Sequence, residues 1–421
     1  MMRKNLTVVL LLINTIFVVA QEAQEKKISY KFYGFVRNDF FYNTRLNKEG
    51  TDGLSVAYPL EVKKDINGKD LNAVPQSEML SYGTRVGVDL SGIDVLGATT
   101  IAKIESDFSG TTGMNPLFRL RHAYVKLNWG KTELLAGQNW HPMYGEVKPN
   151  VLNLSAGSPF QPFARSPQLN LSYKVMDLRF IGAAIYQFQY SSDGPFDATS
   201  KSSTYIKNAN MPELYIGLEN KNKTWVFGAG GEMKKIAPRI SGTVGSSTVK
   251  VNESLTSYAC NIYGQYTNSL LSINTKVIYG QNLSDLCMIN GYGVNSLDTI
   301  TGKQTYTSFN LLSSWLNITY GKKWQIGVFG GYTQNLGSDK SLYEKAGKMS
   351  LFGNGISGNK MIGVMCKISP EISYNLTNFR MGIEYDYTVA EWGDVSPKDG
   401  IVRNADNVLN HRILGFMAYY F

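Results

Sequence analysis

The sequence predicts an all-β fold: a closed antiparallel transmembrane β-barrel of about sixteen strands, with one inward-folded constriction loop. Three observations support this fold class. The chain contains 26 Tyr, 19 Phe and 41 Gly but only 13 Pro, a composition that favours strands and turns. Segments of about ten residues alternate apolar with polar or glycine residues. After Ala20, no apolar run approaches the ~18 residues that predict a transmembrane helix.

The first segment has the pattern of an export signal. In MMRKNLTVVLLLINTIFVVA, Arg3 and Lys4 precede an apolar stretch that ends at Ala20. A membrane anchor helix is the alternative, but the stretch is interrupted by polar residues and is shorter than the ~20 residues that a spanning helix needs. We expect residues 1–20 to be a signal peptide and residues 21–421 to form one barrel domain. Removing the signal lowers the formal charge from +9 to +7.

Alternation with a period of two locates the strands. In LRFIGAAIYQFQY, residues 178–190, Phe180 and Phe188 lie on an apolar face, whereas Arg179 and Gln187 lie on the opposite face. The segments TWVFGAGGEM and FRMGIEYDY alternate in the same way. Each such strand offers one face to lipid and one to water. The expected strands are 30–43, 81–90, 98–108, 117–129, 132–140, 167–175, 178–190, 211–219, 224–234, 256–266, 270–280, 304–319, 324–333, 360–374, 379–392 and 407–421.

The connections between these strands alternate in length. Short turns, such as residues 130–131 and 321–323, exchange with long polar loops, such as residues 44–80 and 235–255. This asymmetry is typical of barrels with short periplasmic turns and long extracellular loops. An even number of strands also allows the barrel to close, which leaves no unpaired edge in lipid. No second domain or helical repeat is predicted.

The chain ends on RILGFMAYYF, which is patterned as a strand rather than as a frayed end. Ile413, Met417, Tyr419 and Phe421 share the apolar parity, and Arg412 has the opposite parity. We expect this last strand to pair with the first and to close the barrel. The alternative is an amphipathic strand of a secreted sandwich, but that fold rarely needs sixteen strands in one domain.

One connection differs from the others. Residues 137–167 are rich in Pro and Gly, yet they also contain apolar and aromatic residues such as Trp140, Phe160 and Phe163. A solvated loop does not need these side chains, so we expect the segment to fold into the barrel as a constriction loop. The alternative is an external loop that covers a subunit contact.

Charged residues at the expected inner face are the candidate pore-lining and constriction residues. They are Arg37, Asp39, Arg85, Lys103, Glu105, Asp107, Arg119, Arg121, Glu146, Arg165 and Arg380. Salt bridges that stiffen the wall are an equally open interpretation of any one of them. Near the constriction, the arginines are expected to make the electric field positive, opposed mainly by Glu146.

Near His122, the alternation places charged residues on the face that is expected to contact lipid. Arg119 and Arg121 have the same parity as Ala123 and Val125, which are expected to face lipid. A charge that faces lipid at mid-depth costs about 2–4 kcal/mol. We therefore expect either a bulge near His122 that shifts the phase or a position of the arginines above the hydrocarbon.

Several segments together resemble a known family. They are YGFVRNDFFY, TRVGVDL, IAKIESDF, FRLRHAYVKLNWGKTELLAGQNW, the Pro-rich loop that follows, and the terminal YYF. The combination is similar to the trimeric porins of Gram-negative bacteria, in particular the DcaP-like family, most clearly over residues 81–145 and at the C-terminus. The resemblance implies an outer-membrane homotrimer with one pore in each subunit, surrounded by lipid and passing small anionic or dicarboxylate solutes.

We expect a passive diffusion channel for small hydrophilic solutes, mildly anion-selective, and not an enzyme. A hydrolase barrel would need a nucleophile and a base, but His122, His141 and His411 lie in no recognisable motif. Because these histidines look isolated, we expect no metal or other cofactor. The chain has no polybasic run, and no nucleic-acid partner is expected. A plugged structural or adhesive barrel is the remaining alternative.

Overall fold

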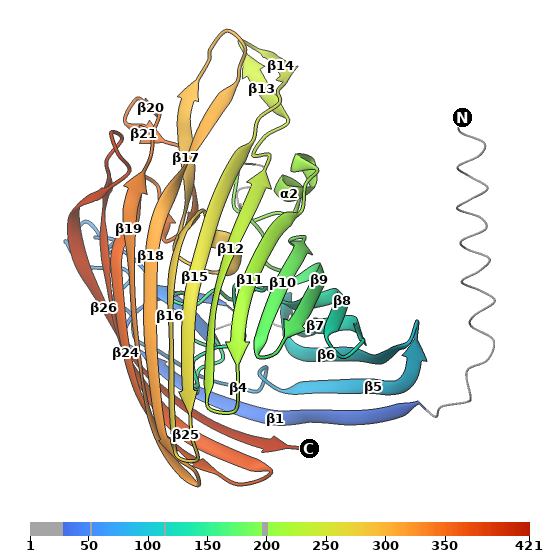
Figure 1. Cartoon of the computed structure of the whole chain (residues 1–421). Coiled ribbons are helices and arrows are strands. Elements are labelled where there is room, and N and C mark those ends of the chain that lie inside the picture. The colour runs from blue at the N-terminus through green and yellow to red at the C-terminus, as the bar shows by residue number, and fades with distance from the viewer. Residues whose placement is uncertain (1–27, 51–52, 113–114, 196–200) are drawn as a thin grey trace, which may run out of the picture.

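The computed structural model describes residues 28–50, 53–112, 115–195 and 201–421 of the chain. The predicted signal peptide, residues 1–20, lies outside these residues. The described chain forms a closed antiparallel β-barrel with sixteen strand positions in its wall (Figure 1). The predicted fold class is confirmed.

The wall strands follow one another in chain order, and β4 and β5 together occupy one position. They are β1 (Ser29–Asn43), β4 (Gln76–Leu80), β5 (Arg85–Val95), β6 (Ala98–Thr112), β7 (Asn115–Asn128), β8 (Thr132–Trp140), β9 (Arg165–Val175), β10 (Leu178–Ile185), β11 (Glu213–Lys221), β12 (Trp225–Ile236), β15 (Leu255–Thr267), β16 (Leu271–Gln281), β18 (Gln304–Gly321), β19 (Trp324–Ser338), β24 (Lys360–Asn375), β25 (Phe379–Val395) and β26 (Val402–Tyr420).

The long connections carry additional short elements. They are β2 (Asn47–Gly50), β3 (Ser55–Pro59), α2 (Thr204–Ala209), β13 (Ser241–Val244), β14 (Ser247–Lys250), the 3-10 helix η1 (Ser284–Leu286), β17 (Asn290–Leu297), β20 (Glu344–Lys345), β21 (Lys348–Met349), β22 (Leu351–Asn354) and β23 (Ile356–Ser357). The hairpins β13–β14 and β20–β21 stand at the long-loop end of the barrel, at the top of Figure 1. Neither α2 nor any other helix of the described residues is long and apolar enough to cross a membrane.

The expected strands correspond to the wall strands, although several limits differ, as in β6, which reaches Thr112, and β19, which reaches Ser338. The segment expected at 178–190 ends as a strand at Ile185, because the next pairing position on β9 is Pro167. Tyr186 still donates a backbone hydrogen bond to Pro167, but proline has no N–H to return. The segment expected at 81–90 begins earlier, as β4, and is interrupted before β5.

The chain end closes the barrel as predicted. β26 pairs antiparallel with β1, and the backbone N–H groups of Phe421 and Gly34 each donate to the other residue's carbonyl oxygen, at 3.1 and 3.0 Å. Along this strand Ile413 and Met417 are exposed on the outer face, whereas Arg412 is buried inside. Figure 1 shows the C-terminus beside β1.

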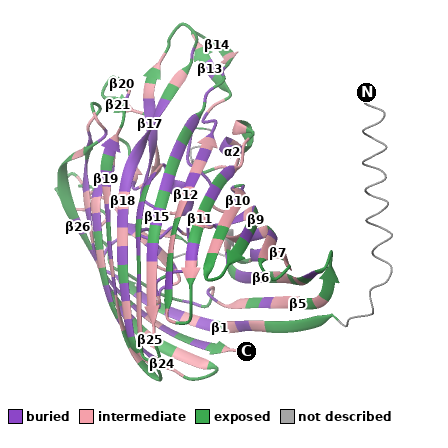
Figure 2. Ribbon diagram, viewed as in Figure 1, coloured by how far each residue is buried: buried purple, intermediate pink, exposed green. Residues whose placement is uncertain are grey.

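Inner and outer faces alternate along the other wall strands as well. On β15, Ser257, Ala259 and Asn261 are buried, whereas Tyr258 and Ile262 are exposed. Figure 2 shows this alternation as bands along β15 and β18. The outer face carries exposed aromatic and aliphatic side chains, which suits lipid, and the inner face carries polar and charged side chains.

The predicted phase shift near His122 is a β-bulge in β7. Glu105 of β6 pairs with His122, and the next residue, Ser106, pairs with Leu120, so Arg121 is an extra residue in β7. A bulge places two successive residues on the same side of the strand. Both Arg121 and His122 are accordingly buried inside, while Leu120 and Val125 are exposed outside.

Candidate functional site

The interior of the barrel is crossed by residues 141–164, which we call the crossing loop. It leaves β8 at Trp140 and joins β9 at Arg165. Wall residues from distant strands bind its backbone: Arg37 of β1 donates to the carbonyl oxygen of Leu152 at 2.8 Å. The Leu152 N–H in turn donates to Glu384 of β25 at 2.8 Å. The loop therefore lies inside the barrel, between walls that are far apart in the sequence.

Further contacts hold the loop against β16, β18 and β19. The buried Lys276 ammonium donates to the carbonyl oxygen of Met143, and the Trp315 indole N–H donates to Gln161 at 2.8 Å. Phe160 packs against the wall at residue 331 because that residue is glycine: a Cβ there would lie 2.5 Å from the Phe160 ring. The absent side chain at Gly331 thus makes room for the loop.

The first long connection also enters the barrel, which the sequence analysis did not predict. The hydroxyl of Tyr58, in β3, accepts a hydrogen bond of 2.8 Å from the backbone N–H of Gly355. The indole N–H of Trp392 donates to the carbonyl oxygen of Pro59 at 2.9 Å. The apolar run LSVAYPL, residues 54–60, was the available signal, because an external loop has no reason to be apolar.

Five charged residues on β5, β6 and β7 form what we call the arginine cluster: Arg85, Arg119, Arg121, Glu105 and Asp107. Arg121 bridges the two acids, with Nε 2.8 Å from Glu105 and Nη1 2.6 Å from Asp107. Arg119 lies 2.9 Å from Asp107, and Arg85 lies 3.5 Å from Glu105. The cluster contains three cations and two anions, so its formal charge is positive.

The cluster presents Arg119 and Arg85 to the interior, whereas Arg121 is as buried as the acids, with 7% of its side chain exposed. The side chains of Arg119 and Arg85 are 27% and 21% exposed, whereas those of Asp107 and Glu105 are 3% and 9% exposed. The buried acids therefore hold the guanidinium groups in place through ion pairs. A solute in the interior meets mainly the positive groups.

Two cavities lie on opposite faces of the crossing loop. The upper cavity, about 270 Å³, is bordered by Lys48, Tyr58, Arg119, Ser155 and Lys201. The lower cavity, about 220 Å³, lies toward the short turns and is bordered on its wall side by Arg179, Tyr215, Glu219 and Tyr263. Both combine charged and aromatic side chains, which is the character of a solute site rather than of a lipid contact.

Tyr144 shows how closely the root of the loop is packed. Its ring stacks on Trp140 with the ring centroids 4.2 Å apart. Burial raises the pKa of Tyr144 to about 12, so its hydroxyl stays protonated throughout the physiological range. This side chain contributes packing and no charge to the interior.

His141 is not isolated, contrary to the sequence-based expectation. Its Nε2 lies 3.3 Å from Glu213 and 3.8 Å from Glu232, and all three residues are buried. The backbone N–H of Met143 donates to its Nδ1 at 3.2 Å, so the ring proton belongs on Nε2. A metal ion at Nε2 would force this proton onto Nδ1. There it would face the Met143 N–H, which now donates to Nδ1. The geometry therefore fits a buried hydrogen bond to Glu213 better than a metal site.

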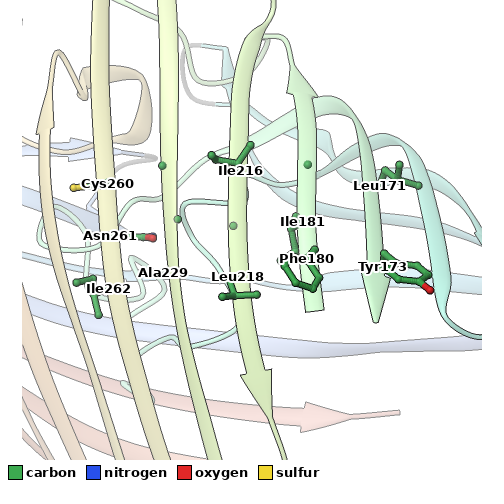
Figure 3. Close-up of a pocket in the computed structure, with 14 residues that line it drawn as sticks. Leu171, Tyr173, Phe180, Ile181, Ile216, Leu218, Ala229, Cys260, Asn261 and Ile262 are labelled. Carbon is green, nitrogen blue, oxygen red and sulfur yellow. The ribbon is translucent and has the colours of Figure 1, made fainter. Parts of the chain in front are cut away.

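A groove on the outside of the barrel has different character. It has a volume of about 760 Å³, runs over β9, β10, β11, β12 and β15, and is bordered by Phe180, Ile216 and Ile262 (Figure 3). These three side chains are half or more exposed and apolar. The groove belongs to the face that lipid covers and not to the interior site.

Comparisons with known proteins agree with this geometry. No protein-family model and no curated protein sequence matches the chain. Among solved structures, the outer membrane channel DcaP of Acinetobacter baumannii is similar with a TM-score of 0.66 and 14% identity, over 94% of this chain and 99% of that one. The chain has the fold of an outer-membrane porin. OmpT, an outer membrane protein of Vibrio cholerae, aligns with a TM-score of 0.55 and 12% identity over 95% and 100% of the chains.

A third solved structure is also similar. The anion-selective porin from Comamonas acidovorans has a TM-score of 0.51 and 10% identity, over 94% of this chain and 100% of that one. Identities this low establish the shared porin fold alone. The roles of individual residues must come from the geometry of this chain.

In this porin fold, the remaining predicted site residues lie inside the barrel in separate places. Arg37 is paired with Asp39 under the crossing loop, with their closest atoms 2.5 Å apart. Lys103 lies 2.8 Å from Asp89 on the neighbouring strand. Arg380 has neutral partners, and its Nη2 lies 3.4 Å from Gln325.

Glu146 was expected to oppose the arginines near the constriction, but it forms no ion pair with the arginine cluster. Glu146 borders the lower cavity and pairs with Lys221 at the end of β11. The acids that oppose the arginines are instead Glu105 and Asp107, on the strand next to them. Sequence alone could not find these pairs, because they depend on the register between β6 and β7 and on the bulge at Arg121.

Proposed function

We propose that this protein is an outer-membrane porin: a channel for passive diffusion of small hydrophilic solutes, exported through the periplasm with residues 1–20 as its signal peptide. The carrying observation is a closed barrel whose outer face is apolar and whose charged interior is crossed by residues 141–164. Such a wall needs lipid outside, and such an interior needs water or solute inside. In this role the crossing loop is the constriction.

We assign mild anion selectivity to the channel, because the arginine cluster carries one positive charge in excess and exposes Arg119 and Arg85 rather than its acids. At an effective dielectric constant of ~20, one charge about 4 Å from an ion is worth roughly 4 kcal/mol before desolvation, which is enough to set a preference. Small carboxylates, including dicarboxylates, are the expected solutes, and no enzymatic activity is assigned.

A homotrimer of the DcaP-like type is the assembly we propose. Its support is the similarity to DcaP and to a structure of Vibrio cholerae OmpT described as a trimer form, with a TM-score of 0.53 and 13% identity over 94% of this chain and 99% of that one. The molar mass of the purified protein in detergent tests the proposal. A monomeric mass, after subtraction of the detergent, would contradict it.

A plugged barrel is the second candidate function. It is favoured by one observation: two segments, the crossing loop and the β2–β3 hairpin, occupy the interior and leave two separate cavities. In that case the protein would act as a structural or adhesive barrel.

Single-channel recording in a planar lipid bilayer distinguishes the two functions. For a porin we expect stable conductance steps in potassium chloride, and in a salt gradient a reversal potential whose sign shows chloride preference. Absence of conductance from correctly assembled barrel, verified by heat-modifiable gel mobility, would favour the plugged barrel. Conductance with cation preference would retain the porin and contradict its anion selectivity.

A further inference from the structure

An aromatic group separates the upper and lower cavities. Phe163 and Tyr190 border the upper cavity, whereas Trp140 borders the lower one. The rings of Trp140 and Phe163 meet edge to face with centroids 5.0 Å apart, and those of Phe163 and Tyr190 do so at 5.9 Å. We call these three residues the aromatic partition.

Arg165 is enclosed by this partition. Its guanidinium carbon lies 4.9 Å from the centroid of the Trp140 ring, 5.4 Å from that of Tyr190 and 5.6 Å from that of Phe163. Arg165 and Trp140 are paired across β9 and β8, which fixes the arginine at the root of the crossing loop. The residue has 0% exposure. Its charge is therefore surrounded by ring faces and edges rather than by water.

Arg165 has unused hydrogen-bond donors. Its Nη2 donates to the Tyr190 hydroxyl at 2.9 Å, but Nε and Nη1 have no acceptor. Within the described part of the chain, Arg165 forms no salt bridge, and the nearby Asp107 is occupied by Arg119 and Arg121. Buried charges in native proteins are normally paired, because an unpaired charge has lost its hydration without compensation. The free donors indicate a place for an anion.

We propose that Arg165 binds the carboxylate of an aromatic solute, such as a benzoate-like acid, as the solute passes from one cavity to the other. The carboxylate accepts hydrogen bonds from the unused Nε and Nη1 donors. The inference rests on the proposed channel function and names one substrate class for it.

An aromatic body fits the surroundings of Arg165 better than an aliphatic one. To reach the guanidinium, a solute must separate rings that now contact the arginine and each other. An aromatic ring restores those contacts by packing against Phe163, Tyr190 or Trp140 in stacked or edge-to-face geometry. An aliphatic dicarboxylate displaces the same rings and replaces none of their contacts. The upper cavity, at about 270 Å³, also has room for a single-ring acid.

Binding to the purified full-length protein in detergent tests the proposal without requiring conductance. The titrants are benzoate, benzamide, which has the ring but no charge, and cyclohexanecarboxylate, which has the charge but no aromatic ring. We expect benzoate to bind at least about tenfold more tightly than either compound. Benzamide loses the charge-assisted hydrogen bond, and cyclohexanecarboxylate loses the aromatic contact. Equal affinity of the three compounds would overturn the proposal.

Two matched variants locate the site. Arg165→Gln keeps a polar side chain beside Tyr190 and removes a buried unpaired charge, so we expect the barrel to assemble. It is expected to weaken benzoate binding at least about tenfold. Arg403→Gln, which changes an exposed arginine paired with Asp399, is expected to leave it unchanged. Benzoate binding that survives Arg165→Gln, or that both variants weaken equally, would place the anion elsewhere.

The two proposals fail separately. In the proposed channel, chloride preference in a bilayer depends on the arginine cluster. It is therefore expected to persist in Arg165→Gln. A conducting, chloride-preferring channel without Arg165-dependent benzoate binding contradicts the inference alone. A barrel that binds benzoate through Arg165 but conducts nothing contradicts the channel and retains the binding site.

Discussion

At the scale of single residues, the charge of the interior is decided by how arginines and acids are layered. Glu105 and Asp107 are buried against the wall and each contacts two arginines. Because the acids are buried, they orient the guanidinium groups through ion pairs and do not themselves face the cavity. The excess positive charge of the cluster faces the cavity. The bulge at Arg121 is essential, since without it the arginine would point to lipid.

Removing two arginines of the cluster reverses its charge. In Arg119→Ala with Arg121→Ala, Arg85 remains against two carboxylates, so we expect the reversal potential in a salt gradient to shift toward cation preference. The control is Arg119→Lys with Arg121→Lys, which keeps the charge and is expected to keep the sign. An unchanged reversal potential in the double alanine variant would show that the cluster does not act on permeating ions.

Gly331 tests whether the crossing loop restricts the channel. A Cβ at residue 331 would lie 2.5 Å from the Phe160 ring, so Gly331→Leu is expected to push the loop away from β19 and to increase single-channel conductance. Gly330→Leu is the matched control, because a Cβ at residue 330 meets nothing within 4 Å. If both variants conduct like the wild type, the loop does not set the conductance.

At the scale of single elements, the last strand, β26, closes the barrel by pairing with the first strand. β26 pairs with β25 on one side and β1 on the other, and the Phe421 backbone is bonded to Gly34 in both directions. An unpaired edge in lipid would leave several backbone groups without partners, each at a cost of several kcal/mol. Closure of the barrel therefore depends on the chain end.

Deleting Phe421 is expected to reduce the amount of assembled barrel far more than loss of one exposed side chain would. Both backbone bonds to Gly34 disappear, together with the ring that packs beside Gly34. Phe421→Ser keeps the backbone bonds and is expected to have a smaller effect. Heat-modifiable mobility on a gel measures the assembled fraction. If the deletion variant gives as much assembled barrel as the wild type, closure does not depend on Phe421.

At the scale of the whole molecule, the wall and the interior are built from different segments. The wall consists of regular antiparallel strands, whereas the interior is filled by the crossing loop and by the β2–β3 hairpin. The wall supplies its own backbone hydrogen bonds, so it does not need either segment for closure. The contents of the interior and the closure of the wall can therefore be changed separately.

Shortening the first long connection tests this separation. Replacing residues 47–59 by a short Gly-Ser linker removes Tyr58 and the carbonyl that accepts from Trp392. We expect the barrel to assemble and its conductance to rise, because the upper cavity opens. Loss of heat-modifiable barrel in this variant would show instead that the hairpin is part of the core. Unchanged conductance would show that the hairpin does not obstruct the path.

The strands of the wall can be predicted from the amino-acid sequence. The alternation that marks residues 132–140 as a strand is local, and β8 has those same limits. The same local signal placed Arg412 inside and Ile413 outside, and the conflict between Arg121 and its apolar neighbours already indicated the bulge. Period-two patterning is a property of each strand alone, so it can be read without knowing the neighbours.

The contacts inside the barrel depend on the tertiary structure. Arg37 reaches Leu152, His141 reaches Glu213, and Tyr58 reaches Gly355 across long separations in sequence. Glu146, expected beside the arginines, instead pairs with Lys221. The paths of irregular loops and the register between strands set these contacts, and neither leaves a periodic signal. The arrangement of charge in the interior therefore belongs to the folded barrel and not to any one segment of the chain.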